Sequence, residues 1–361
     1  MKIISVAPIV LSIPFDAGGS GEGIMPTTWN TLDFCLVRIE TDAGLVGWGE
    51  GFGYYCSRAV AAIMERSIAP LLLGQPLPDP RVFSEQAQRR LVLQGRYGIT
   101  TFALSGVDIA LWDLAAKAQG VSIVKLLERG IKRDRVPAYA SLVRYGDAEL
   151  VCRYAEQAIE ESFTEIKLHE ITMPEIRACR KAIGDLPMSI DVNCNWSLEQ
   201  TRRFIPELME LEARWLEEPI FPPEDFRALA SLRSLGLPIA TGENACTAFQ
   251  LAQICQEGAA DFLQPSITKM GGISEFLKVI DSPYDTPLMP HSPYFGPGYL
   301  ATLQIAAMES KFDLFEFLYV NPQAWLYFEM PVPERGEIRI PNAMGLGMDP
   351  DEAAINKYRV D

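Results

Sequence analysis

The stretch that decides the fold contains three short runs, PMSIDVN (residues 187–193), RWLEE (214–218) and PIATGE (238–243). Each run is rich in apolar side chains and carries an acidic residue at or near its end. Segments with helical periodicity separate the runs. Short strands that alternate with helices are typical of a parallel sheet built from crossover units, so we expect an α/β fold here.

The same alternation extends on both sides of this stretch. Further runs of strand type lie at residues 136–141, 165–169, 260–266, 287–292 and 313–318. Eight strands alternating with helices are the pattern of a (β/α)8 barrel. A doubly wound open sheet is the competing architecture, but it requires a Gly-rich phosphate loop after an early strand, and the sequence has none. The sequence therefore predicts a (β/α)8-type, TIM-like barrel.

The first third of the chain has a different texture. Strand patterns come first there, and helical periodicity follows, most clearly at residues 101–119. We expect residues 1–132 to form an α+β capping domain and residues 133–330 to form the catalytic barrel. The tail, residues 331–361, has few helix signals and is expected to return to the capping domain.

Composition limits the classes of function. The formal net charge is −15 and no basic run is present, which argues against nucleic acid or an anionic membrane as a partner. The apolar N-terminus, residues 1–15, lacks a signal-peptide cleavage site, and we expect a strand there. Seven cysteines without a CxxC motif fit reduced thiols rather than disulfides or a zinc site. We expect a cytoplasmic homo-oligomeric enzyme with a small-molecule substrate.

Polar side chains recur once per strand–helix unit at the carboxyl ends of the predicted strands. They are Lys167, His169, Asp191, Asn193, Glu217, Glu218, Glu243, Ser266, His291 and Glu316. Barrel enzymes carry their active sites at this end of the strands. The spacing therefore predicts a ring of functional groups around one mouth of the barrel.

Asp191, Glu217 and Glu243 would place three carboxylates on successive strands. Such carboxylates repel one another unless a cation lies between them. An all-oxygen ligand set favours Mg²⁺ over Zn²⁺. Each acid taken alone could equally be a helix cap or a loop residue, but three in register favour one Mg²⁺ per subunit bound by these side chains.

Lys167 and His169 lie on one face of one predicted strand, because residues i and i+2 point the same way. A cation beside an imidazole disfavours a second positive charge, which keeps the imidazole available as a base. His291, the second of the two histidines in the chain, ends a strand on the opposite side of the barrel. We expect Lys167, His169 and His291 to be the catalytic residues.

A long segment between two early strands, residues 16–30, is rich in Gly, Ser and Thr and includes Met25 and Trp29. Long loops that contain large apolar side chains often close over a ligand. We expect this segment to be a lid over the active site.

Several motifs together resemble the mandelate racemase and muconate-lactonizing branch of the enolase superfamily over nearly the whole chain. They are GVDIALWD (106–113), the Lys167-x-His169 pair, DVN (191–193), WLEEP (215–219), GEN (242–244), GGI (271–273) and GLG (345–347). WLEEP and GEN at this separation are specific, whereas the glycine motifs alone would be weak. The resemblance implies a capped barrel that uses Mg²⁺ to remove a proton beside a substrate carboxylate.

The resemblance also implies roles for individual residues. Asp191, Glu217 and Glu243 match the Mg²⁺ ligands, Lys167 would contact the substrate carboxylate, and His169 stands where the family commonly has a lysine base. Glu316 matches a position that holds the carboxylate in some members. The residues expected to bind substrate are Asn193, Ser266, Glu316, Trp29 and Tyr54, the last two on segments similar to the loops that set specificity.

One slot departs from the family pattern. Ser266 stands where racemase-like members have an Asp that pairs with the strand-seven His, and where lactonizing members have a Lys. Lys269, three residues on, is expected to lie past the strand end as a structural residue. His291 would then lack its orienting carboxylate and be a weaker base but a usable acid. Racemisation needs a base on both faces, so this departure favours elimination.

The leading hypothesis is Mg²⁺-dependent abstraction of the proton α to a carboxylate through an enediolate, followed by dehydration (β-elimination) or ring-opening of a sugar acid. The protein would then be a metal-dependent carbon–oxygen lyase. A racemase, epimerase or cycloisomerase of the same family is the first alternative. A catalytically inactive carboxylate-binding protein is the alternative of another class, because a fold does not guarantee an activity.

Overall fold

A computed structural model of the 361-residue chain describes residues 1–19 and 29–360. The expected lid over residues 16–30 lies largely outside the described residues, and Met25 with it. Trp29 lies within them.

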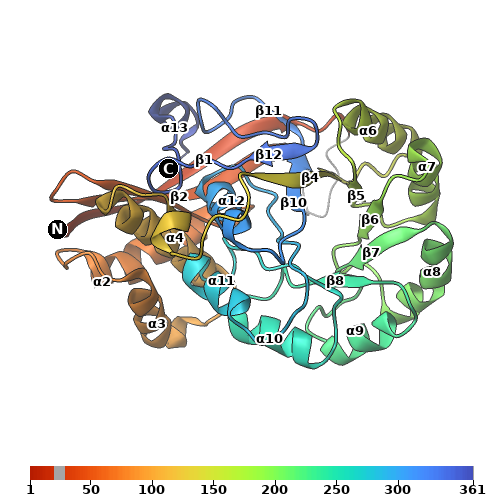
Figure 1. Cartoon of the computed structure of the whole chain (residues 1–361), viewed down its shortest axis with the longest axis horizontal. Helices are drawn as coiled ribbons and strands as arrows, with labels where there is room; N and C mark the ends of the chain where they lie inside the picture. Colours follow the sequence, from red (N-terminus) through yellow and green to blue (C-terminus); the bar gives the residue numbers. More distant parts are fainter. Residues whose placement is uncertain (20–28, 361) are drawn as a thin grey trace.

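The N-terminal part of the chain forms an antiparallel sheet covered by helices (left in Figure 1). Its strands are β1 (Ile3–Asp16), β2 (Thr31–Thr41) and β3 (Val46–Gly51). The helices that follow are α1 (Ser57–Ile63), a π-helical turn (Met64–Ile68), α2 (Ala69–Leu72), α3 (Pro80–Arg90), a 3-10 turn (Val92–Gln94), α4 (Ile99–Ala118) and α5 (Ile123–Leu126). We call this part the cap.

Helix α4 packs closely on strand β3 because glycines face each other at the contact. A Cβ atom at Gly49 would lie 1.9 Å from the carbonyl oxygen of Gly106, so the two backbones could not approach with any larger residue there. Helix α4 is long and apolar enough to span a membrane by length and composition, yet 83% of its apolar window is buried inside the protein. It serves here as the core helix of the cap.

The second part is a barrel with helices around its outside (right in Figure 1). Its parallel strands are β4 (Arg135–Leu142), β5 (Ile166–Leu168), β6 (Met188–Asp191), β7 (Ala213–Glu217), β8 (Ile239–Thr241), β9 (Phe262–Leu263) and β10 (Phe315–Tyr319). Its helices are α6 (Ala148–Glu160), α7 (Met173–Ile183), α8 (Leu198–Glu210), α9 (Phe226–Arg233), α10 (Ala248–Gln256), α11 (Gly272–Ile280) and α12 (Pro297–Met308). The predicted α/β class, a (β/α)8-type barrel with an α+β cap, is confirmed.

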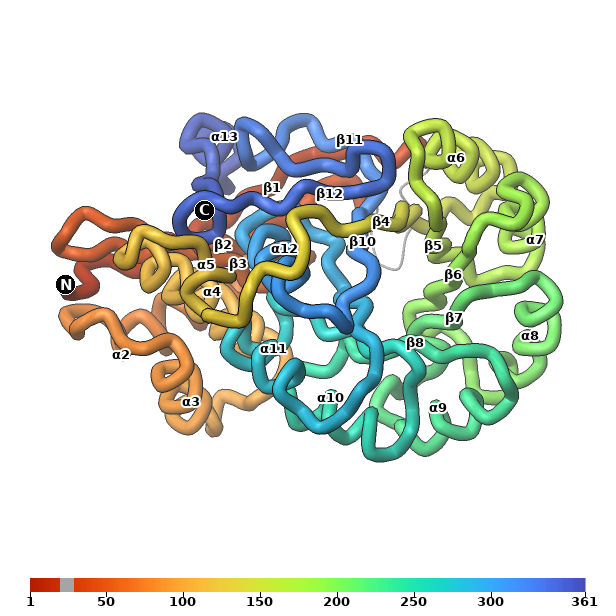
Figure 2. The backbone as a smooth tube through the Cα atoms, in the orientation of Figure 1, coloured from red at the N-terminus to blue at the C-terminus, as the bar shows by residue number. Residues whose placement is uncertain are grey.

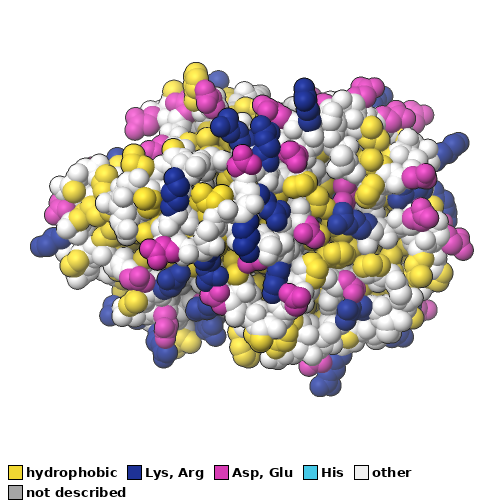
Figure 3. All heavy atoms as spheres, viewed as in Figure 1, with side chains coloured by type: hydrophobic (Ala, Val, Ile, Leu, Met, Phe, Trp, Pro, Cys, Tyr) yellow, Lys and Arg dark blue, Asp and Glu magenta, His cyan; other side chains and the backbone are white. Residues whose placement is uncertain are grey.

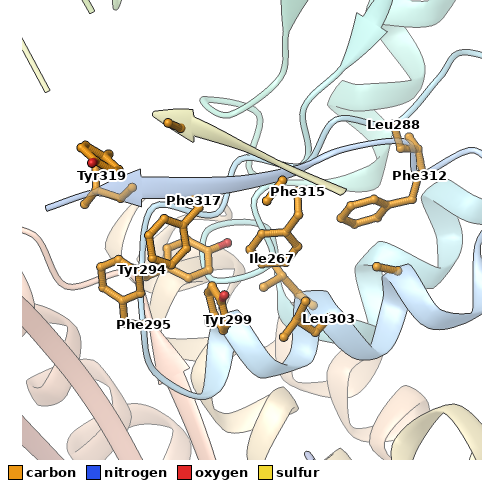
Figure 4. Packing of buried hydrophobic residues seen from close by; sticks show 14 of the residues in the cluster. Ile267, Leu288, Tyr294, Phe295, Tyr299, Leu303, Phe312, Phe315, Phe317 and Tyr319 are labelled. Atoms are coloured by element: carbon orange, nitrogen blue, oxygen red, sulfur yellow. The ribbon is translucent and has the colours of Figure 1, made fainter. Parts of the chain in front are cut away.

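The seventh barrel strand, expected at residues 287–292, is reduced to a single bridging residue. Leu288 forms parallel bridges to Leu263 on one side and to Phe312 on the other, and these bridges close the barrel. Figure 4 shows Leu288 beside Phe312. Pro287 and Pro290 flank this point and have no N–H to donate to a strand ladder. The prolines therefore explain why the predicted strand does not extend.

Strand β10 shows how the barrel core directs side chains into the mouth. Phe315 and Phe317 lie on one face of the strand, where Phe315 contacts Tyr299 and Phe317 contacts Phe295 near α12 (Figure 4). Because successive residues of a strand point to opposite faces, the residue between them, Glu316, points into the barrel. Packing of the aromatic face thereby places a carboxylate at the mouth.

The C-terminal tail contacts both parts of the molecule. Strand β11 (Asn321–Pro322) pairs with β1, and strand β12 (Glu337–Arg339) pairs antiparallel with β4. Helix α13 (Glu352–Tyr358) packs against β1, and just beyond it the backbone N–H of Val360 donates to the carbonyl of Val10. Figure 2 shows this tail running alongside β1.

Charged side chains of both signs are interspersed on the face of the molecule shown in Figure 3. The net charge of −15 is therefore not gathered into one acidic patch on that face. An anionic ligand needs a local group of positive charge to bind to such a protein.

Candidate active site

A cavity lies at the carboxyl ends of the barrel strands, beneath the cap. Its lining comes from both parts of the molecule and consists of Trp29, Phe52, Tyr54, Val143, Arg144, His169, Asn193, Glu243, Lys269, His291, Pro293, Glu316 and Leu318. Seven of these were expected from the sequence: Trp29, Tyr54, His169, Asn193, Glu243, His291 and Glu316. The other expected residues, Lys167, Asp191, Glu217 and Ser266, lie fully buried next to this lining.

Three buried carboxylates meet at the cavity. Asp191 and Glu217 are paired across β6 and β7, and Glu243 follows β8 by two residues. One ligand oxygen from each lies within 4.8 Å of the others. Burial raises the pKa of Glu217 well above its usual value, and the neighbouring acids add to this against the opposing effect of Lys167. This crowded set of hard oxygen donors fits a divalent cation such as Mg²⁺.

Lys167 lies inside a cage of carboxylates. Its Nζ is 2.8 Å from Oε1 of Glu217, 2.7 Å from Oε1 of Glu316 and 3.4 Å from Oδ2 of Asp191. Burial lowers the pKa of Lys167, but these acids raise it to well above its usual value, so the ammonium is charged. The side chain has no exposed surface. It therefore offsets the charge of the acids from inside the barrel and does not face the cavity.

Glu316 is fixed as an ionised carboxylate at the edge of this cage. Besides the Lys167 contact, Ser141 Oγ donates to its Oε1 at 2.8 Å and the backbone N–H of Ser292 donates to its Oε2 at 2.9 Å. Burial alone would raise the pKa of Glu316, but Lys167 and the hydrogen bonds lower it to about 2.

His169 has one ring nitrogen committed to the backbone. Its Nδ1 lies 2.5 Å from the carbonyl oxygen of Leu142, and since a carbonyl only accepts, Nδ1 carries a proton. The other nitrogen, Nε2, lies 3.3 Å from Oδ2 of Asp191. Nε2 is therefore the atom of His169 that can exchange a proton with a ligand.

His291 also has its Nε2 against a carboxylate, but a different group lies behind its Nδ1. Its Nε2 lies 3.0 Å from Oε2 of Glu243, and its Nδ1 lies 3.1 Å from Oγ of Ser266. Burial lowers the pKa of His291, although Glu243 opposes this, so the ring is neutral near pH 7. A carboxylate only accepts, so the single ring proton lies on Nε2, and Ser266 can donate to Nδ1. Ser266 thus orients His291 rather than lining the cavity.

Two cavity cations were missed or misassigned in the sequence. Arg144 follows β4 by two residues, and its Nε donates to the carbonyl of His169 at 2.7 Å while its Nη2 donates to Oδ1 of Asn193 at 3.3 Å. Its place just after the first barrel strand was the signal that could have identified it. Lys269 was expected to be structural, yet it lines the cavity, because the turn after β9 folds it back towards Glu243, 3.8 Å away.

The cap contributes an aromatic wall. Trp29 and Tyr54 have ring centroids 5.4 Å apart, and Phe52 lies 5.2 Å from Tyr54. The hydroxyl of Tyr54 donates to the carbonyl of Pro293, which ties the cap to the loop that carries His291. Tyr54 therefore presents its ring to the cavity.

Comparison with known families matches two models that together cover most of the chain. Residues 23–128 match the mandelate racemase / muconate lactonizing enzyme N-terminal domain, and residues 150–354 match the enolase C-terminal domain-like model.

Individual relatives carry out different reactions. The chain is 30% identical to D-xylonate dehydratase of Haloferax volcanii over 90% of this chain and 85% of that protein. It is 31% identical to D-galactarolactone cycloisomerase of Agrobacterium fabrum over 90% of this chain and 91% of that protein. Among solved structures, a racemase from Streptomyces coelicolor with bound magnesium has a TM-score of 0.86 at 25% identity, covering 99% of this chain and 100% of that one.

Proposed function

We propose, because the chain belongs to the mandelate racemase / muconate lactonizing enzyme family of the enolase superfamily, that it removes the proton α to the carboxylate of a sugar acid and then expels the β-oxygen. The observation that carries this proposal is the buried set Asp191, Glu217 and Glu243 with a histidine Nε2 at either end, His169 beside Asp191 and His291 beside Glu243. Relatives that are sugar-acid dehydratases and a cycloisomerase support it.

The three carboxylates would hold one Mg²⁺. When bound, the ion supplies positive charge that stabilises the negative charge developing on the substrate carboxylate as the α-proton leaves. A neighbour with bound magnesium supports this choice of metal. Lys167, which is also paired with Glu316, would fix the positions of Asp191 and Glu217 through its ion pairs with them.

His169 would take the α-proton. Its ring is oriented by the bond from Nδ1 to Leu142, so a neutral His169 presents a lone pair at Nε2. Loss of this hydrogen bond would let the ring turn away from the cavity, because the group bonded to one ring nitrogen fixes the direction of the other.

His291 would protonate the departing oxygen. In its neutral form it carries a proton at Nε2, on the opposite side of the metal-binding acids from His169. The β-hydroxyl then leaves as water with the proton from His291, while the α-proton stays on His169. The enol becomes a 2-keto acid when its β-carbon takes up a proton; in a lactone the ring oxygen leaves as a carboxylate and the ring opens. A racemase would need a base at this position, and the Ser266 contact favours an acid instead.

The proposal is tested by incubating a panel of acid sugars with the enzyme and Mg²⁺ in D₂O. At least one member should lose its α-proton signal by NMR and give a 2-keto acid or a ring-opened product. Deuterium incorporation at the α-carbon without loss of water would identify a racemase or epimerase instead. If an enzyme with one Mg²⁺ per chain exchanges no α-proton of any member, the proposed function is wrong.

A further inference from the structure

The cavity has more positive charge than the proposed chemistry uses. Much of its remaining lining is apolar: Trp29, Phe52, Val143, Pro293 and Leu318. The polar lining residues outside the acid–base and metal groups are Tyr54, Arg144, Asn193 and Lys269. The Tyr54 hydroxyl is already bonded to Pro293, so two cations and one amide remain for recognition.

Arg144 is held rigidly but bonded only to neutral groups. Its Nε binds the carbonyl of His169 and its Nη2 binds the amide oxygen of Asn193. Among the residues that the structure describes, none accepts a hydrogen bond from Nη1. The guanidinium therefore stands at the cavity wall with donors available to a ligand.

No carboxylate of the described chain lies within 4.0 Å of this guanidinium. The two acids that act on it electrostatically are Asp191 and Glu170. Asp191 belongs to the metal-binding set, and Glu170 accepts from the backbone N–H groups of Tyr145 at 2.7 Å and Gly146 at 3.0 Å. A partly buried charge without a counter-ion is costly, so an anion from a ligand would stabilise it.

Lys269 differs from Arg144 in having partners already. Its Nζ lies 3.8 Å from Glu243 Oε1, 3.4 Å from the amide oxygen of Asn244 and 5.1 Å from the ring centroid of Phe52. The charge of Lys269 thus offsets that of Glu243. Arg144 is then the cavity cation that a ligand anion would stabilise.

We infer that the substrate carries two anionic groups, one at the metal-binding acids and one at Arg144. Its class is a dicarboxylic sugar acid (an aldarate), rather than a monocarboxylic aldonate. This inference rests on the proposed function. The planar guanidinium suits a carboxylate because its N–H groups match the two carboxylate oxygens, and the net charge of −15 makes such a local cation necessary.

The test uses acids matched in length and stereochemistry: galactarate against galactonate, and glucarate against gluconate. The wild-type enzyme with Mg²⁺ should have the higher kcat/KM on the diacid of a reactive pair. Arg144→Met should lower kcat/KM on that diacid by roughly 100-fold, mainly through KM, because one charged partner is removed. The loss on the monoacid should be smaller by at least about tenfold, because the monoacid offers no second carboxylate to Arg144.

Two variants separate substrate binding from support of His169, whose carbonyl Arg144 also binds. Arg144→Lys keeps the charge and should recover part of the diacid preference. Lys269→Met removes the other cavity cation and should change both acids of a pair by the same factor. If Arg144→Met slows α-proton exchange equally on both acids, Arg144 is a positioning residue and the inference is wrong.

The remaining outcomes distinguish this inference from the proposed function. An enzyme that dehydrates monoacids in preference to their diacids overturns the dianionic substrate and leaves the elimination chemistry intact. An Mg²⁺-loaded enzyme that exchanges no α-proton of either class overturns the proposed function, and the dianionic substrate with it.

Discussion

The two sides of the barrel mouth carry the same side chain with opposite surroundings. On one side, His169 Nδ1 faces the carbonyl oxygen of Leu142, and on the other, His291 Nδ1 faces the hydroxyl of Ser266. The carbonyl requires a proton on Nδ1, whereas the hydroxyl permits a bare Nδ1 and leaves the proton on Nε2. We therefore expect the group behind each imidazole, more than the imidazole itself, to determine whether it takes or gives a proton.

The largest effect is expected from the carboxylates that lie between the two histidines. Glu217→Gln should lower turnover by at least about 10³-fold, because a bound divalent ion is worth several kcal/mol to a developing oxyanion. Both α-proton exchange and water loss should fall together, since both depend on the same ion. Turnover and metal content per chain are the measurements.

The exposed acid Asp185 provides a matched control, because Asp185→Asn changes the same charge far from the barrel mouth. Chelation followed by dialysis should reproduce the Glu217→Gln defect in wild type and be reversed by Mg²⁺. Full activity of Glu217→Gln in metal-free buffer would remove the basis of the metal site.

Replacing each histidine in turn tests most directly whether the two have different roles. His169→Asn should abolish exchange of the substrate α-proton in D₂O, because the base is gone. His291→Asn should slow water loss while exchange stays measurable, provided that the proton step is reversible. Losing one such group typically costs about 10²–10⁴-fold in rate. NMR of both variants beside wild type reads the two steps separately, and the reverse pattern would exchange the roles.

Much of this arrangement could be predicted from the sequence because barrel units repeat. Alternating apolar runs identified seven of the barrel strands, and the spacing of polar residues at their ends identified Asp191, Glu217 and Glu243 as neighbours. The length of the seventh strand was overestimated, because the prediction gave the hydrophobic pattern more weight than Pro287 and Pro290. These prolines have no N–H to donate to the strand ladder.

Side-chain direction beyond the strand ends could not be predicted. The alternation rule applies within a strand, but Arg144 and Lys269 lie in turns after β4 and β9, where the path of the loop decides what they face. The depth of Lys167 depends on how three neighbouring strands converge on it, and a linear sequence does not encode that distance directly. The roles assigned to these residues stay predictions until the variants are measured.

The contrast between the histidines can be sharpened by changing the group behind one of them. Ser266→Asp places a carboxylate at Nδ1 of His291, which fixes a proton there and raises the pKa of the ring from its lowered value. We expect water loss to slow by roughly 10–100-fold, because a ring of higher pKa gives up its proton less readily and is the stronger base once it has lost it. Chiral analysis of recovered substrate should show some inversion at the α-carbon.

Ser266→Ala is the control for this variant, since it removes the hydroxyl without adding a charge. It should slow water loss by about tenfold or less, as expected for one hydrogen bond, and should produce no inversion. Equal effects of the two substitutions would mean that residue 266 packs against His291 without setting its proton.

The smallest effect concerns stability and follows from the lowered pKa of His291, whose first cause is burial. In the unfolded chain this histidine binds a proton as pH falls through about 6.5, whereas in the folded chain it resists protonation to lower pH. The unfolded state then binds more protons, so this residue makes the protein less stable as pH falls from 7.5 to 5.5.

His291→Asn removes that penalty. In chelator-treated protein, the Tm of the variant minus that of wild type should therefore rise on acidification, by about 3 °C at most. Thermal melts at steps of about 0.5 pH unit measure this difference. A single group titrates over roughly two pH units, so this spacing resolves the change. A difference that falls as pH drops would place a stabilising proton on His291, which contradicts the neutral ring on which its role as the acid depends.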